Sequence, residues 1–270
     1  MTVSILGCGW LGFPLAIALK GDYEVKGSTT NPNKMAKIQA GGIQPYLIDL
    51  GSHETQDNIE SFFDTDLLFV NIPPKRKVPL HLDDYPKVIG NIISMAKQRV
   101  EKIIFISSTG VYNNDNQVVL ESDNQEPISK GGKIWMTAEN IVKNSGMNWI
   151  IIRSAGLIGP NRDPGKWFAG KSNIPNGLSP VNLIHLDDCI EILKRIISSD
   201  IQNDVFNLCT DSHPSRMDFY TSQSKRLGLE LPQFKEEVGR YKVISNQKIK
   251  KTLNYQFIHS DLSSLTSENF

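Results

Sequence analysis

Three glycines near the beginning of the sequence have the spacing of a phosphate-binding turn. Residues 3–6 form a short apolar run, the pattern G-x-G-x-x-G follows over 7–12, and apolar residues recur at helical spacing over 15–19. A glycine turn between a strand and a helix lets a pyrophosphate approach the backbone and the free N–H groups at the helix N-terminus. We therefore predict dinucleotide binding, with an ordinary glycine turn as the alternative. The predicted contacts in the turn are Gly7, Gly9, Trp10, Leu11 and Gly12.

The polar segment after the next apolar run bears on which dinucleotide is bound. Sites specific for NAD place Asp or Glu about 20 residues after the glycines, where the carboxylate holds the ribose 2′-hydroxyl. Residues 27–31 contain no acid. Ser28, Thr29 and Asn31 can donate hydrogen bonds to a 2′-phosphate, and Lys34 can neutralise it. A carboxylate would repel that phosphate, so its absence favours NADP(H) over NAD(H).

Alternating strand and helix patterns predict the scaffold that positions these residues. Strands are expected over 23–28, 43–50, 66–71, 102–107 and 149–153, and helices over 31–40, 88–96 and 134–143. Repeated strand–helix–strand units form parallel sheets with helices on both faces. The sequence thus predicts an α/β protein with a Rossmann-type, doubly wound parallel sheet.

The pattern changes after residue 158. Residues 159–182 are rich in Gly, Pro, Asn and Ser, and loops of this length in compact domains are usually functional. Alternation then resumes, with helices expected over 187–198 and 219–227 and a strand over 205–208. We expect residues 1–158 to form an NAD(P)-binding domain. Residues 159–270 would build a small substrate-binding lid interwoven with the same sheet, so that the chain is effectively one domain.

The composition excludes several classes of protein. Lys plus Arg equals Asp plus Glu at 29 each, which argues against nucleic acid or an anionic membrane as partner. No apolar run approaches the roughly 18 residues of a transmembrane helix, and no signal peptide is expected. Cys8, Cys189 and Cys209 form neither a zinc pattern nor a disulfide framework, so we expect a reducing cytoplasm and no metal site. The basic run at 75–77 is expected to be a solvated loop, with a substrate-phosphate contact as the alternative.

Three further segments resemble the extended and atypical branches of the short-chain dehydrogenase/reductases. They are I-I-F-I-S-S-T-G-V-Y at 103–112, I-R-S-A-G-L-I-G-P at 152–160 and V-N-L-I-H-L-D-D at 181–188. The sequence is also similar to a YeeZ-like group described as NAD-dependent epimerase/dehydratases. The resemblance implies a nicotinamide cofactor and a small-molecule substrate. It also implies a homodimer, which is common in the family.

The resemblance assigns further residues to the cofactor. Asp49 and Leu50 match the pair that contacts the adenine, and residues 71–73 match the backbone that runs along the cofactor. The cofactor contacts added in this way are Asp49, Leu50, Asn71, Ile72, Pro73 and Ser107.

One departure from the family concerns the catalytic pair. Active relatives carry Tyr-x-x-x-Lys on the helix after the fifth strand. The Tyr hydroxyl exchanges a proton as hydride moves, and the Lys lowers the pKa of that hydroxyl and holds the ribose. Counting from Pro127 and from Glu139 places Gly131 and Trp135 at these two positions. The usual acid–base pair is therefore absent from this chain.

The remaining candidates surround the expected substrate. The resemblance aligns Ser108 with the catalytic hydroxyl of the family, and Tyr112 is the candidate replacement acid because it is the only tyrosine near the expected site. The candidate substrate contacts are Thr109, Arg153, Trp167 and His185. Three of these residues have a structural alternative. The Ser108 hydroxyl can hydrogen-bond to backbone groups at the end of its strand instead of to a substrate. Arg153 can form an internal salt bridge instead of binding an anionic substrate. His185 can have a structural role instead of acting as an acid–base group.

Two functions remain open. The first is an atypical oxidoreductase or nucleotide-sugar epimerase/dehydratase, in which Ser108 polarises the substrate oxygen and water or Tyr112 supplies the proton. The second is an inactive NADP(H)-binding sensor, motivated by Gly131 and Trp135. We favour the enzyme because the loop over 159–182 is longer than a pure cofactor binder requires. Binding of FAD or of a nucleoside sugar alone fits the remaining motifs less well.

Overall fold

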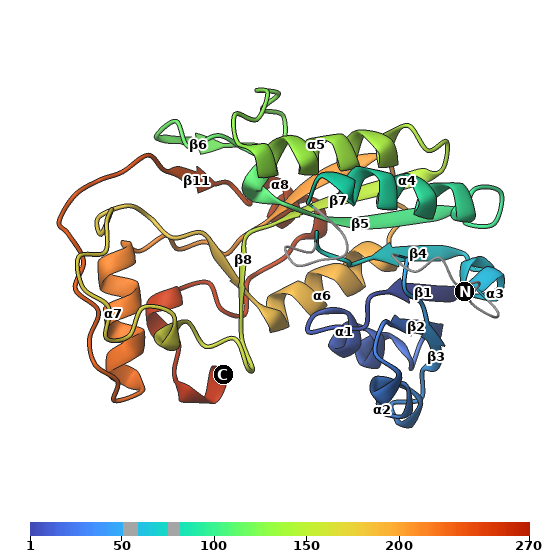
Figure 1. The fold of residues 1–270 in the computed structure, drawn as a ribbon, viewed down its shortest axis with the longest axis horizontal. Helices are drawn as coiled ribbons and strands as arrows, with labels where there is room; N and C mark the ends of the chain where they lie inside the picture. Colours follow the sequence, from blue (N-terminus) through green and yellow to red (C-terminus); the bar gives the residue numbers. More distant parts are fainter. Residues whose placement is uncertain (51–58, 75–81) are drawn as a thin grey trace. The chain divides into compact units, whose positions relative to one another are not determined.

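Seven strands form one sheet, in the order β10-β7-β5-β4-β1-β2-β3 (Figure 1). The computed structural model describes residues 1–50, 59–74 and 82–270. The strands are β1 Thr2–Leu6, β2 Glu24–Thr29, β3 Gln44–Leu47, β4 Leu67–Val70, β5 Lys102–Ser108, β7 Asn148–Ser154 and β10 Asp204–Leu208. β1 pairs in parallel with β2 and β4, β2 with β3, and β4 with β5. The strand order reverses beside β1, and doubly wound sheets bind ligands at such a switch point, beyond the carboxyl ends of the strands.

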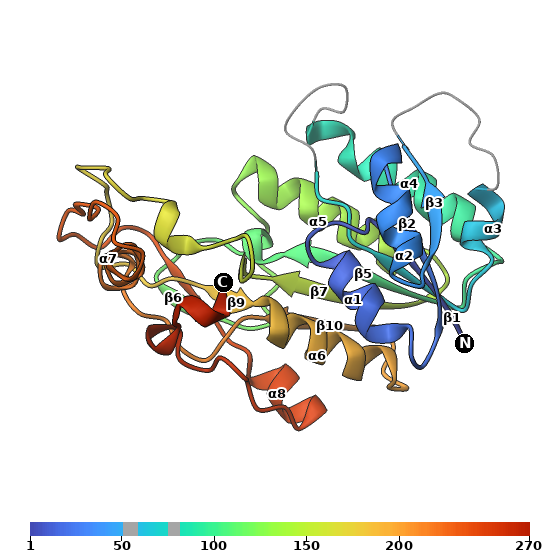
Figure 2. The ribbon, with the colours of Figure 1, turned by 90° about the horizontal axis from the view of Figure 1, so that it is seen from below.

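Helices cover both faces of this sheet. The helices of the described chain are α1 Gly12–Leu19, α2 Met35–Ala40, α3 Ile59–Phe63, α4 Tyr85–Ala96, α5 Lys130–Lys143, α6 Leu186–Ile197, α7 Arg216–Arg226 and α8 Gln247–Leu253. α4 and α5 lie on one face and α1 on the other (Figures 1 and 2). The apolar residues of α4 recur at helical spacing, and they pack with Ala138 of α5 and Phe105 of β5 in one buried cluster. The predicted doubly wound α/β sheet is confirmed.

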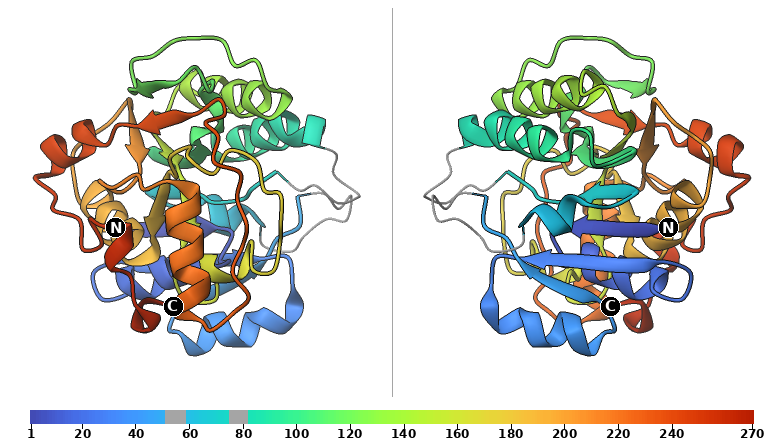
Figure 3. Two further views of the ribbon diagram at one scale, coloured as in Figure 1. Left: turned by 90° about the vertical axis from the view of Figure 1, so that its left-hand side faces the viewer. Right: turned by 90° about the vertical axis from the view of Figure 1, so that its right-hand side faces the viewer.

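The described chain forms two compact units, each assembled from three segments. Unit 1 comprises Met1–Val111, Pro127–Arg153 and Leu193–Val205, and unit 2 comprises Tyr112–Glu126, Ser154–Ile192 and Phe206–Phe270. Unit 1 contains the glycine turn. Strands β1 to β4 lie side by side in the right-hand view of Figure 3. The domain division expected at residue 158 stays a prediction.

Unit 2 contains two small parallel pairs of strands. β6 (Gln117–Val119) pairs with β11 (Lys242–Ile244), and β8 (Gly156–Ile158) pairs with β9 (Leu183–His185). Three-residue strands are too short to show a period of two, so the sequence patterns did not indicate them. Figure 3 (left) shows α7 beside the C-terminal segment, and Phe219 of α7 packs there with Leu262 and Leu265.

Several predicted boundaries differ from the structure, among them those of α5 and β3. The helix expected from residue 134 begins at Lys130, because Ser129 caps it by accepting a hydrogen bond from the Gly132 N–H at 3.0 Å. The first turn of this helix is polar and contains Gly131, so the spacing of apolar residues does not mark it as helical. The strand expected over 43–50 ends at Leu47.

No described helix is long and apolar enough to cross a membrane. Cys8, Cys189 and Cys209 are buried free thiols. Burial raises the pKa of Cys8 and that of Cys209 to about 12, so both stay protonated near neutral pH.

Candidate functional site

The glycine turn packs against the carboxyl ends of β2 and β4, the two strands that flank β1. Gly7 has φ +103°, and a Cβ there would lie 2.7 Å from the Asn71 carbonyl oxygen at the end of β4. The Gly7 N–H donates to the Ser28 hydroxyl at 2.9 Å. A Cβ on Gly12 would collide with the Gly7 carbonyl oxygen. The turn therefore requires glycine at positions 7 and 12 for its own packing.

Gly9 differs from these two glycines. A Cβ built on Gly9 meets no described atom within 4 Å, so packing does not require a glycine at this position. Gly9 also lines a pocket in unit 1. Its missing side chain leaves the backbone open to a ligand, as expected if a pyrophosphate lies against it.

The pocket lies beyond the carboxyl ends of β1, β2, β3 and β4, where the strand order reverses. Its lining residues are Leu6, Gly7, Cys8, Gly9, Ser28, Thr29, Thr30, Lys34, Ile48, Asp49, Leu50, Asn71, Ile72, Pro73, Tyr85 and Val88. Most of the predicted cofactor contacts are in this group. Trp10, Leu11, Gly12, Asn31 and Ser107 are not, and the basic run at 75–77 lies outside the described residues.

The segment after β2 contributes one positively charged side chain, that of Lys34, and no carboxylate to the pocket lining. Ser28 is buried and engaged with the glycine turn, and the Thr29 hydroxyl accepts a hydrogen bond from the Asn31 N–H at 3.1 Å. The Asn31 side chain accepts from the Asn33 N–H at 3.0 Å and caps the 3₁₀ turn Pro32–Lys34. These bonds fix the course of the chain, so that Lys34 lies at the pocket. Thr30, which the sequence analysis missed, lies there too.

An apolar wall faces this polar segment. Ile48, Leu50 and Val88 line the pocket together with Tyr85 at the start of α4. The Tyr85 hydroxyl donates to the Ile72 carbonyl oxygen at 2.8 Å, and burial raises the pKa of this phenol. An apolar slot of this kind suits a flat aromatic base.

The end of β5 and the start of α5 contain the positions that the sequence analysis proposed as catalytic. The Ser108 hydroxyl accepts a hydrogen bond from the Gly110 N–H at 3.0 Å, while Thr109 is buried. The N-terminal turn of α5 packs closely here, because a Cβ on Gly132 would lie 2.7 Å from the Gly110 carbonyl oxygen. A Cβ on Gly131, the position expected to hold the family's Tyr, would meet no described atom within 4 Å.

Ser107 and Arg153 meet at a buried carboxylate. Glu139 is 0% exposed, and its Oε1 accepts from the Ser107 hydroxyl at 2.7 Å. Arg153 Nε donates to Glu139 Oε1 at 3.0 Å, and its NH2 group donates to Oε2 at 2.8 Å. This two-point pair is the internal salt bridge that the sequence left open. Since Arg153 is 3% exposed, its part in substrate binding stays a prediction, as does the contact of Ser107 with the cofactor.

Tyr112 and Trp167 belong to unit 2. The Tyr112 hydroxyl is buried and donates to Asn207 Oδ1 at 2.8 Å, which does not suit a freely accessible acid. The Trp167 ring lies 6.0 Å from that of Tyr220, in a cluster that also contains Phe168 and Phe234. The contact of Trp167 with a substrate stays a prediction.

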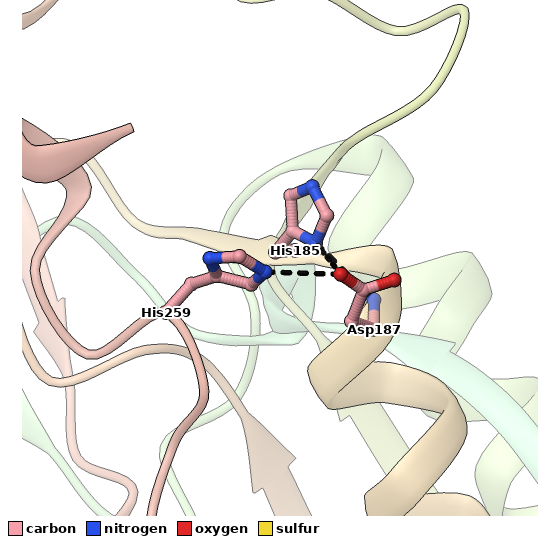
Figure 4. A group of neighbouring side chains, drawn as sticks. All are labelled: His185, Asp187 and His259. Atoms are coloured by element: carbon pink, nitrogen blue, oxygen red, sulfur yellow. Dashed lines mark hydrogen bonds and ion pairs between the residues drawn. The ribbon is translucent and has the colours of Figure 1, made fainter. Parts of the chain in front are cut away.

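His185 also belongs to unit 2 and lies in a group that the sequence did not indicate. Its ring is 1% exposed, and burial lowers its pKa while a hydrogen bond to the Asn269 carbonyl oxygen opposes the shift. Figure 4 shows Asp187 and His259 beside it, with both rings directed at one Asp187 oxygen. His259 is 74 residues away in the sequence, and no motif around it indicates this contact.

Comparison with known sequences gives two matches over most of the chain. A family model described as NAD(P)H-binding matches residues 14–178. Protein YeeZ of Escherichia coli (strain K12) is 33% identical over 266 residues, which cover 96% of each chain.

Solved structures show the same fold at low sequence identity. UDP-glucuronic acid 4-epimerase from Bacillus cereus, in complex with UDP-glucuronic acid and NAD, has a TM-score of 0.78 at 20% identity, covering 97% of this chain and 96% of that one. A short-chain dehydrogenase/reductase superfamily protein from Agrobacterium tumefaciens with bound NAD has a TM-score of 0.77 at 14% identity, covering 97% and 95%. These likenesses confirm the Rossmann-type fold that the sequence predicts.

Proposed function

Because the chain belongs to the NAD(P)H-binding family, with the fold of the NAD-dependent epimerases and short-chain dehydrogenase/reductases, we propose that it binds NADP(H) in the pocket of unit 1. We propose further that it moves a hydride between the nicotinamide and a carbonyl or hydroxyl carbon of a small-molecule substrate. A cytoplasmic location and a homodimer accompany this proposal as predictions.

The observation that carries the proposal is the pocket itself. It places Gly9 and Lys34 on one surface with Thr30 and the apolar wall that contains Leu50 and Tyr85. The open backbone at Gly9 suits the pyrophosphate, and the apolar wall suits the adenine. Lys34 and Thr30 can hold a 2′-phosphate, because no carboxylate ends β2 to repel it. Asp49 stands on the same surface and is assigned to the adenine amino group.

The reaction needs a group that polarises the substrate oxygen and a source for one proton. When bound, NADPH supplies the hydride. The Ser108 hydroxyl accepts from Gly110, so its own proton is oriented away from that bond and can be donated to a substrate oxygen. Because Gly131 leaves open space at the position expected for the family's Tyr, water can reach the end of β5 and supply the proton.

Nucleotide sugars are the substrate class that we propose first. The Bacillus cereus epimerase of the same fold is in complex with UDP-glucuronic acid. Small aldehydes and ketones are the alternative substrates. Thr109, Arg153, Trp167 and His185 are the predicted substrate contacts.

One specific observation favours a second candidate, a non-catalytic NADP(H) sensor. Trp135 stands at the position expected for the Lys that would hold the nicotinamide ribose, and Gly131 at the position expected for the Tyr that would exchange the proton. Both groups are therefore missing from this chain. A sensor must distinguish the oxidised from the reduced cofactor in affinity and turn over no substrate.

The test is a turnover screen with matched variants. Purified protein is incubated with NADPH and carbonyl compounds, and with NADP or NAD and UDP-sugars, while cofactor absorbance and sugar products are followed. The enzyme is supported if Ser108→Ala abolishes turnover and Ser94→Ala preserves it. Ser94 is the matched control because it is an exposed residue of α4 whose hydroxyl donates to the Gly90 carbonyl oxygen. Turnover unaffected by Ser108→Ala contradicts the role of Ser108. No turnover, with widely different affinities for NADPH and NADP, supports the sensor.

A further inference from the structure

Two histidine rings and a carboxylate converge on one point of unit 2 (Figure 4). His185 ends β9, Asp187 lies in the first turn of α6, and His259 follows α8. His185 Nδ1 lies 3.2 Å from Asp187 Oδ2, and His259 Nε2 lies 3.0 Å from the same oxygen. The three ligand atoms all lie within 4.8 Å of one another.

The hydrogen bonds of His185 fix which of its ring nitrogens carries the lone pair. Nε2 lies 2.8 Å from the Asn269 carbonyl oxygen, which can only accept, so Nε2 carries the proton. Nδ1 therefore carries the lone pair, and the Asp187 N–H lies 3.3 Å from it, a long and weak hydrogen bond that metal binding at Nδ1 would replace. In the neutral ring, which burial favours, Nδ1 and Asp187 Oδ2 are therefore two acceptors that face each other. A cation between them removes this repulsion.

His259 is held in place by its backbone on both sides. Asp188 is 0% exposed, and its Oδ2 accepts the His259 N–H at 3.1 Å, while its Oδ1 accepts from the Tyr255 hydroxyl at 2.7 Å. The Thr210 hydroxyl donates to the His259 carbonyl oxygen at 2.5 Å. The position of His259 beside His185 is thus set by a buried network and does not depend on their mutual contact.

We propose that His185 Nδ1, Asp187 Oδ2 and His259 Nε2 bind one divalent transition-metal ion, with zinc as the preferred ion. Two imidazoles and a carboxylate are a ligand set that zinc accepts, with bonds of about 2.0–2.2 Å. Asp187 Oδ2 lies 3.2 Å from one ring nitrogen and 3.0 Å from the other, and both separations are ones that two ligands of a single zinc ion can have. The bond from His185 Nε2 to the Asn269 carbonyl supplies the outer support that zinc-binding histidines usually have.

The bound ion would join segments that are distant in the sequence. His185 and Asp187 bracket the junction of β9 and α6, whereas His259 belongs to the segment that follows α8. Asp187 is 50% exposed, so the ion would keep a side open to water or a small ligand. Binding to the folded protein alone would raise the midpoint of thermal unfolding. This site shares no residue with the NADP(H) pocket, so cofactor binding and metal binding can each fail without the other. Metal binding at His185 would replace its predicted contact with a substrate.

The test uses metal-free, full-length protein titrated with Zn²⁺ by calorimetry and with Co²⁺ by visible absorption. We expect one equivalent of either ion to bind, with the intense Co²⁺ bands of a four-coordinate site, and zinc to raise the thermal midpoint. Asp187→Asn keeps the shape of a half-exposed side chain, and His259→Gln removes a second ligand. Each should weaken zinc affinity by at least about tenfold.

Control variants separate this cluster from the other histidines. His213→Asn removes a ring in the same unit whose Nδ1 contacts the Val181 carbonyl oxygen at 3.0 Å. A double variant, His53→Gln with His81→Gln, removes the two histidines outside the described residues. Both should bind zinc as the unaltered protein does. Absence of binding overturns the proposal, as does binding that Asp187→Asn and His259→Gln leave unchanged.

Discussion

The ring of Trp135 lies edge-on against that of Tyr85, with centroids 5.1 Å apart and planes at 70°. The resemblance to the short-chain dehydrogenase/reductases places Trp135 at the position expected for the Lys that holds the ribose, and Tyr85 lines the pocket. The Tyr85 hydroxyl donates to the Ile72 carbonyl oxygen, and Ile72 lines the pocket as well. Trp135 thus supports Tyr85 in the wall of the pocket, and we predict that this aromatic contact takes the place of the family's polar contact to the ribose.

Trp135→Ala should weaken both the fold and cofactor binding, because it removes the support behind Tyr85. Since Trp135 is only partly buried, we expect a loss of about 2 kcal/mol in the free energy of unfolding, below the range for fully buried aromatics. Trp149→Ala is the matched control, because Trp149 is partly buried against the same cluster and does not line the pocket. Urea unfolding and NADPH titration should show a stability loss in both variants and a weaker affinity only in Trp135→Ala. Equal affinities in the two variants would contradict this account.

Gly9→Ala should separate a ligand-binding turn from an ordinary one. The added methyl group meets no described atom, so the free energy of unfolding should change by less than about 0.5 kcal/mol. Cofactor affinity should fall at least about tenfold, because the methyl group occupies the approach of the pyrophosphate. Gly21→Ala, also with nothing within 4 Å, should change neither quantity. A Gly9→Ala protein that binds NADPH normally would show that the pyrophosphate lies elsewhere.

The main sheet could be predicted because its signals are local. Buried parallel strands such as β4 are continuous apolar runs, and Gly7 and Gly12 mark a turn whose glycines are needed for packing. Tyr85 was missed because it precedes Pro86, and that proline looks like a break although it occupies the first turn of α4. Pairs of three-residue strands carry no period that a sequence pattern can show.

Glu139→Gln should be strongly destabilising, because it leaves the Arg153 guanidinium buried beside a neutral group. Breaking a buried pair in this way costs about 3–5 kcal/mol. Lys130→Met is the control, since Lys130 and Asp83 form a pair whose side chains are 68% and 63% exposed. That change should cost less than about 1 kcal/mol. Chemical unfolding of both variants measures the difference, and a mild effect of Glu139→Gln would show that the pair adds little.

The stability of the protein should fall in mild acid. Burial lowers the pKa of His213 below its ordinary value of 6.5, against the opposing hydrogen bond to the Val181 carbonyl. The unfolded chain therefore takes up a proton at a higher pH than the folded one, so stability is present above about pH 6.5 and is lost as the pH falls below it. His185 shifts in the same direction. Unfolding measured between about pH 5 and 7.5 should show a shallower slope for His213→Asn. An unchanged slope would exclude His213 as a source.

The candidate site could be predicted less completely than the fold, because side-chain partners come from distant segments. Arg153 was correctly placed at the end of a strand, but its partner Glu139 lies on α5, and no spacing rule connects the two. The same holds for Tyr112 and Asn207, and for His185 and His259. Sequence motifs identify residues whose side chains could take part in catalysis or binding. Which of these side chains are accessible depends on tertiary packing, which the motifs do not show.

The central claim is that the pocket of unit 1 binds NADP(H). The most direct measurement is a parallel titration of cofactor-free protein with NADPH, NADP, NADH and NAD, repeated with Lys34→Ala and Lys37→Ala. Lys37 is the control because it lies over the Phe13 ring and does not line the pocket. We expect tighter binding of the two phosphorylated forms, and a loss of about 1 kcal/mol, or about fivefold, for them alone in Lys34→Ala. Equal affinities for NADPH and NADH, unaffected by Lys34→Ala, would contradict the 2′-phosphate assignment, and absence of binding by all four would contradict the function proposed for the pocket.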